Sequence, residues 1–143
     1  LCIGELSRRI SRRFVMSEIT RFQNPEEVVN YYMEEMRHME QEQLHVMLPD
    51  NKQGMIRDVL ISKGTVNASI VSPREILIEA LRYRAVGMIM VHNHPSGDPT
   101  PSREDCSITQ RVKEAGKLVG IQLLDHIVIG DGSYSSFKKE GML

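Results

Sequence analysis

The chain alternates between stretches in which hydrophobic residues recur with helical spacing and stretches with the spacing of strands. Helix-start signals, Asn or Ser followed by Pro or by an acidic first turn, occur at residues 24–27, 72–75 and 102–105. Short apolar runs predict strands at 44–48, 55–61, 86–91, 121–129 and 134–137, with 66–71 as a further edge segment. The strand at 121–129 is expected to be interrupted at Asp125-His126.

The helical spacing also predicts which residues face a core. The predicted inward-facing positions are Val29, Tyr32, Met33 and Met36 in the first helix, Leu77, Ala80 and Leu81 in the second, and Ile108, Val112, Ala115 and Val119 in the third. Helices and strands alternate only in part, and hairpin turns are present. We therefore predict an α/β fold with a mixed β-sheet flanked by helices. Residues 25–143 form the predicted domain, and residues 1–24 an N-terminal arm or the remnant of an upstream region.

Composition narrows the class of protein. A chain of 143 residues with 41% hydrophobic residues and a net charge of −1 is typical of one ordinary globular domain and gives no sign of a nucleic-acid-binding surface. Two cysteines exclude a disulfide framework and a cysteine-rich zinc module. No apolar run predicts a membrane span or a signal peptide, so we expect a cytoplasmic protein. A chain that begins at Leu1 is expected to be a fragment of a longer protein.

One stretch carries the candidate chemistry. His92 and His94 lie at the end of an apolar strand, where residues two apart point to the same face. A loop rich in Pro, Ser and Gly follows, and Ser102 and Asp105 then begin a helix. Two imidazole nitrogens and one carboxylate oxygen, with a position left for water, form the ligand set of a catalytic zinc site. Taken singly, each feature has a plainer interpretation: the histidines as surface polarity, and Ser102 with Asp105 as a capping box.

A catalytic zinc ion also needs a general base, a carboxylate close to the metal that does not ligate it. The spacing alone does not choose it. Candidates are Glu42, Glu75, Glu79, Glu104 and Asp125.

The sequence also resembles a known family. His92-x-His94, seven residues, then Ser102-x-x-Asp105 is similar to the JAMM (MPN-plus) metalloprotease motif, and HNHPSGDPTPSREDCSIT, GTVNAS, SPREI and LLDHIVIG resemble the RadC family over residues 42–137. The resemblance implies a JAMM/MPN fold, similar to the cytidine-deaminase architecture. It implies His92, His94 and Asp105 as Zn²⁺ ligands, Ser102 as hydrogen-bond donor to the tetrahedral intermediate, and Glu42 as the catalytic base.

The same resemblance implies two alternative functions. The leading hypothesis is a zinc-dependent hydrolase that cleaves a peptide or isopeptide bond in a peptide or protein substrate. The alternative is a DNA-repair-associated accessory or DNA-binding protein with a structural or vestigial metal site, whose DNA or DNA-repair partners contact a region upstream of this chain. We expect no membrane partner. The sequence does not indicate an oligomeric state.

Three further features of the sequence are predicted to lie near the site or in the core. Asp125 or His126 either orients a metal ligand from behind or forms a buried structural pair. Cys106, next to Asp105, is predicted to lie in the core and not at the metal. The segment 64–67 is predicted to form one wall of the cleft, as an edge that pairs with an extended substrate.

Overall fold

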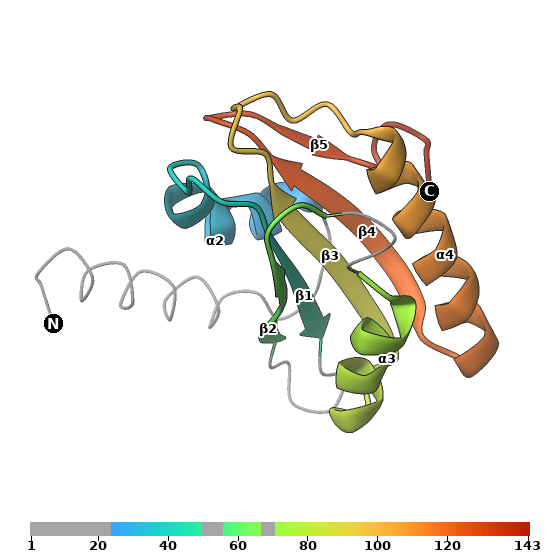
Figure 1. Ribbon diagram of the computed structural model, residues 1–143. Helices are drawn as coiled ribbons and strands as arrows, with labels where there is room; N and C mark the ends of the chain where they lie inside the picture. Colours follow the sequence, from blue (N-terminus) through green and yellow to red (C-terminus); the bar gives the residue numbers. More distant parts are fainter. Residues whose placement is uncertain (1–23, 50–55, 67–70) are drawn as a thin grey trace, which may run out of the picture.

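A computed structural model describes residues 24–49, 56–66 and 71–143 (Figure 1). Five strands form one mixed sheet in the order β2-β1-β3-β4-β5, and three helices flank it, which confirms the predicted fold class. The elements are α2 (Pro25–Met36), β1 (Gln43–Pro49), β2 (Ile56–Lys63), α3 (Pro73–Arg82), β3 (Gly87–Asn93), α4 (Arg103–Val119), β4 (Gln122–Ile129) and β5 (Tyr134–Ser136). Residues 1–23 of the predicted arm and residues 67–70 of the predicted 66–71 segment lie outside the described residues.

The sheet topology brings the start of one strand beside the end of another. Strand β1 is antiparallel to both β2 and β3, with Leu44 opposite His92. Strands β3 and β4 are parallel, and α4 connects them. The residues just before β1 and just after β3 therefore lie side by side at one end of the central strands, and α4 begins at the same end.

Helices cover both faces of the sheet, and each face has its own core. On one face α2 packs against Met47, Ile89 and Val91. On the other face α3 and α4 pack against residues of the alternate set, including Met88 and Met90. Strand β3 is consequently buried along its whole length, which explains why its sequence is apolar at successive positions. By the period of two, His92 lies on the α4 face.

The three helices begin where the sequence predicts. The side chains of Asn24, Ser72 and Ser102 each accept a hydrogen bond from a backbone N–H in the first turn. Helix α4 ends at Gly120, whose φ of 78° lies in the left-handed region that glycine adopts without strain. None of the helices in the part of the chain described is long and apolar enough to cross a membrane.

Several details differ from the prediction. Strand β4 runs without interruption through Asp125-His126, because one residue is absorbed in a bulge at Leu124. Leu81 and Val119, predicted to face inward, are 55% and 48% exposed, since both lie near the ends of their helices. Cys106, predicted to be core, is exposed. The buried stripe of α4 instead runs through Asp105, Ile108, Thr109 and Val112, at the helical spacing i, i+3, i+4, i+7.

Candidate metal centre

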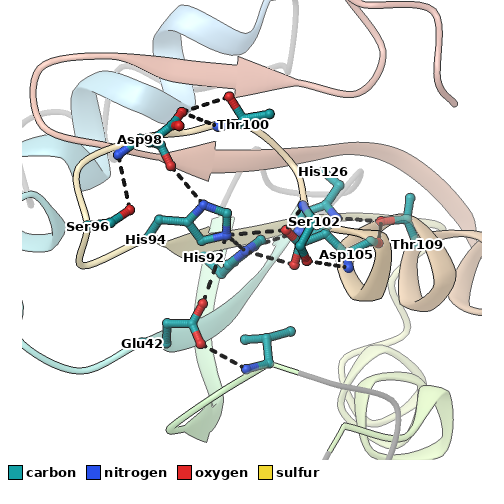
Figure 2. A network of polar contacts seen from close by, with 11 residues as sticks. Glu42, His92, His94, Ser96, Asp98, Thr100, Ser102, Asp105, Thr109 and His126 are labelled. Atoms are coloured by element: carbon teal, nitrogen blue, oxygen red, sulfur yellow. Dashed lines mark hydrogen bonds and ion pairs between the residues drawn. The ribbon is translucent and has the colours of Figure 1, made fainter.

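The two histidines converge at the end of β3. Their Nε2 atoms lie 3.0 Å apart, with the His92 side chain fully buried and that of His94 14% exposed (Figure 2). The backbone N–H of His94 donates to the Ile129 carbonyl, 2.9 Å away, which fixes the loop against the end of β4. The structure thus places both imidazoles on one face, as the spacing predicts.

Asp105 completes a group of three. Its Oδ1 lies 3.1 Å from His92 Nε2 and its Oδ2 lies 3.2 Å from His94 Nε2. Asp105 is also the third residue of α4 and forms a capping box with Ser102: Ser102 N–H donates to Oδ2 at 2.6 Å, and Asp105 N–H donates to Ser102 Oγ at 3.1 Å. The plainer interpretation as a helix cap and the functional one are therefore compatible. Capping holds the carboxylate in place, and the capping bond leaves the Ser102 hydroxyl proton for another acceptor.

Glu42 lies on the other side of the imidazoles, directly before β1. Its Oε1 is 3.9 Å from His94 Nε2, and its Oε2 accepts a hydrogen bond from Val66 N–H at 3.1 Å. One ligand atom from each of Glu42, His92 and His94 lies within 4.8 Å of the others, so this cluster could hold a metal ion. The Val66 contact puts the segment after β2 beside the cluster, where the sequence predicts a cleft wall; Asn67 lies outside the described residues.

The structure separates Glu42 from the other candidate bases. Among the described residues, Glu42 is the carboxylate that joins the two histidines in the metal-type cluster. Glu75 and Glu104 are exposed on helices, and Glu79 pairs with Arg82 at 3.5 Å. Asp125 is fully buried, and its carboxylate is already hydrogen-bonded within the fold. It accepts hydrogen bonds from Ser136 Oγ in β5 at 2.5 Å and from the backbone N–H groups of His126 and Lys138.

The donor set suits a zinc ion. Ligand atoms 2.0–2.1 Å from a tetrahedral zinc lie about 3.3 Å from one another, and the three contacts among His92, His94 and Asp105 measure 3.0, 3.1 and 3.2 Å. His94 Nδ1 lies 2.9 Å from the Asp98 carbonyl, which can only accept, so Nδ1 carries a proton and neutral His94 presents a lone pair at Nε2. A cation between these atoms would satisfy them together.

Contacts within the cluster shift the pKa values of His94 and Asp105. The hydrogen bond to Asp105 raises the pKa of His94, against the opposing effect of burial. Burial alone would raise the pKa of Asp105, but the contacts of its carboxylate with the His92 and His94 rings hold that pKa well below its ordinary value. Asp105 is therefore ionised at neutral pH, which is the form that ligates a metal.

Asn93 is a residue of the site that the sequence analysis did not identify. Asn93, between the two histidines, is fully buried, and its side chain accepts from Gln43 N–H at 2.7 Å and donates to the Gln41 carbonyl at 3.2 Å. These two bonds hold the backbone on both sides of Glu42. The only signal in the sequence was a polar residue at a position that strand periodicity turns toward the α2 face.

Comparisons with known proteins match this chain to one family. The family model described as RadC-like JAB domain matches residues 22–142. UPF0758 proteins are similar to this chain: that of Pelobacter propionicus is 48% identical over 90% of this chain and 56% of its own length, and that of Geobacter sulfurreducens is 45% identical over 97% and 61%. A UPF0758 protein of Clostridium botulinum is 46% identical over 100% of this chain and 62% of its own length. The chain thus spans about 56–62% of the length of these relatives.

Proposed function

The chain belongs to the RadC-like JAB domain family, and because JAB domains are often metal-dependent hydrolases, we propose that it is a zinc-dependent hydrolase of peptide or isopeptide bonds. The observation that carries the proposal is the convergence of two imidazoles and an ionised carboxylate, with Glu42 beside them. His92, His94 and Asp105 would hold the zinc ion. The net charge of −1 gives no support to the alternative of a DNA-binding domain.

Asp105 rather than Glu42 is assigned as the third ligand. The Asp105 oxygens are nearer to the imidazoles, at 3.1 and 3.2 Å against 3.9 Å for Glu42, and its side chain is 2% exposed against 19%. Helix α4 and the cap with Ser102 fix Asp105 in place, and the positive end of the helix dipole favours its charge. Glu42 is more exposed and lies at the edge of the cluster, which suits a group that exchanges protons with water.

A bound zinc ion supplies two effects, a lowered pKa of water and polarisation of the scissile carbonyl. Glu42 removes a proton from the attacking water as its oxygen bonds to the carbonyl carbon. The Ser102 hydroxyl donates a hydrogen bond to the carbonyl oxygen as negative charge develops there. Glu42 then delivers its proton to the amide nitrogen, the C–N bond breaks, and a carboxylic acid and an amine are released.

The test is hydrolysis by zinc-loaded protein of fluorogenic linear peptides and of peptides joined through a lysine side chain. Glu42→Gln should lower kcat by about 10²–10⁴-fold, the usual contribution of general acid–base catalysis. Comparison of the two substrate sets assigns the bond type. The proposed function would be contradicted if the zinc-loaded wild type hydrolysed neither set of peptides. It would also be contradicted if Glu42→Gln hydrolysed them at the same rate as the wild type.

A further inference from the structure

A chain of buried polar contacts extends from the candidate ligand His92 into the protein. His92 Nδ1, the nitrogen turned away from the cluster, lies 2.8 Å from Nε2 of His126 on β4 (Figure 2). His126 Nδ1 in turn lies 2.5 Å from Oγ1 of Thr109 on α4. His92 and His126 are fully buried and Thr109 is 2% exposed, so water does not complete these contacts. The ring of Phe137 stacks on His126 at 4.7 Å and 14° and closes its outer face.

The direction of each hydrogen bond follows from the number of protons available. The Thr109 hydroxyl has one proton and donates it to the backbone carbonyl of Asp105, 2.5 Å away. Thr109 Oγ1 can then only accept from His126, so the His126 proton lies on Nδ1. With the ring proton on Nδ1, His126 Nε2 is left as the acceptor. His92 Nδ1 must donate to it.

The consequence lies at the other side of the His92 ring. A neutral imidazole carries one proton, and with that proton on Nδ1 the Nε2 atom presents its lone pair to His94 and Asp105. The carbonyl that accepts the Thr109 hydrogen bond belongs to Asp105. The Thr109 hydroxyl therefore contacts both the backbone of the candidate ligand Asp105 and His126, which contacts the candidate ligand His92.

We propose that Thr109 and His126 are positioning residues that hold the proton of His92 on Nδ1, so that the Nε2 lone pair faces the zinc site. The inference rests on the proposed function, in which His92 is a ligand. It gives His126 a role at the metal site. Its neighbour Asp125 has a different role, because it accepts hydrogen bonds from Ser136 in β5 and from Lys138 in the following turn.

The first experiment measures zinc affinity by competition with a chelator. Thr109→Val removes the hydroxyl and keeps the shape of the side chain, whereas Thr109→Ser keeps the hydroxyl. Loss of a partner behind a metal ligand typically weakens binding about 10–100-fold, and we expect a loss in this range for Thr109→Val with recovery in Thr109→Ser. Unchanged affinity in Thr109→Val, or an equal loss in both variants, would overturn the proposal.

The second experiment needs no metal and separates this inference from the proposed function. Nitrogen-15 NMR of the metal-free wild type should show His92 and His126 protonated at Nδ1 and unprotonated at Nε2. In Thr109→Val the His126 and His92 signals should move toward the other tautomer. A His92 proton on Nε2 in the wild type would overturn the inference even if zinc binds. The predicted pattern in a protein that binds no zinc would support the roles of Thr109 and His126 and refute the metal site. The wild-type spectrum decides the matter if Thr109→Val does not fold.

Discussion

Gly130, in the turn after β4, leaves no room for a side chain beside the loop that carries His94. A Cβ atom there would lie 2.4 Å from the Gly97 carbonyl oxygen and 3.0 Å from Pro99 Cδ. That same carbonyl accepts the hydrogen bond from Asp131 N–H at 3.0 Å, which joins the loop to the turn. Gly130→Ala must therefore push the loop away from the turn and strain or break this bond.

The cost can be worked from these contacts. Overpacking costs about 1–3 kcal/mol, and a lost backbone hydrogen bond adds about 0.5–1.5 kcal/mol, giving a total of roughly 1.5–4.5 kcal/mol. At roughly 4 °C per kcal/mol for a domain of this size, Gly130→Ala should lower Tm by about 6–18 °C. Zinc binding should weaken as well, because His94 N–H bonds to Ile129, the residue before Gly130.

The assay is a thermal melt of metal-free protein followed by a zinc titration, with Gly120→Ala as the matched control. A Cβ at Gly120 meets no atom within 4 Å, and its φ of 78° makes alanine cost about 1–2 kcal/mol through the backbone alone. Gly120 ends α4, at the opposite end of that helix from Asp105, so the control should keep wild-type zinc affinity. An unchanged Tm and unchanged zinc affinity in Gly130→Ala would refute the reasoning.

Two further predictions concern other contacts. Asn93→Leu should destabilise the fold by about 1–3 kcal/mol for each backbone group left without a partner, and should speed hydrogen exchange at the Gln43 amide; wild-type protection of that amide would count against the role of Asn93. On the surface, the hydrogen bond from Tyr134, followed by that from Lys139, lowers the pKa of Glu26 from 4.5 to about 2. Because the pKa is lowered in the folded state, the stabilisation is present above pH 4.5 and is lost as the pH falls toward 2. The difference in unfolding free energy between the wild type and Glu26→Gln should shrink over that range, and a difference independent of pH would contradict this assignment.

Local rules predicted a large part of the fold and of the candidate site. The helix starts at Asn24, Ser72 and Ser102 follow from hydrogen bonds within four residues, and the shared face of His92 and His94 follows from strand geometry.

The remainder depends on contacts between distant parts of the chain. Asn93 reaches Gln41, 52 residues away in sequence, and His92 meets His126, 34 residues away. No spacing rule gives such pairs. The burial of Cys106 was predicted wrongly because the apolar stripe of α4 passes through a carboxylate, Asp105, which a hydrophobic pattern does not count.

The central claim is that His92, His94 and Asp105 hold the metal and that Glu42 does not. The most direct measurement is zinc per chain by elemental analysis, after zinc loading and dialysis, for the wild type, Asp105→Asn and Glu42→Gln. Asparagine keeps an oxygen that can accept from Ser102 N–H, so the cap persists while the charge at the metal is lost. We predict about one zinc ion in the wild type and in Glu42→Gln and loss of zinc in Asp105→Asn. Zinc lost from Glu42→Gln and kept by Asp105→Asn would make Glu42 the third ligand and contradict the account, as would a wild type that binds none.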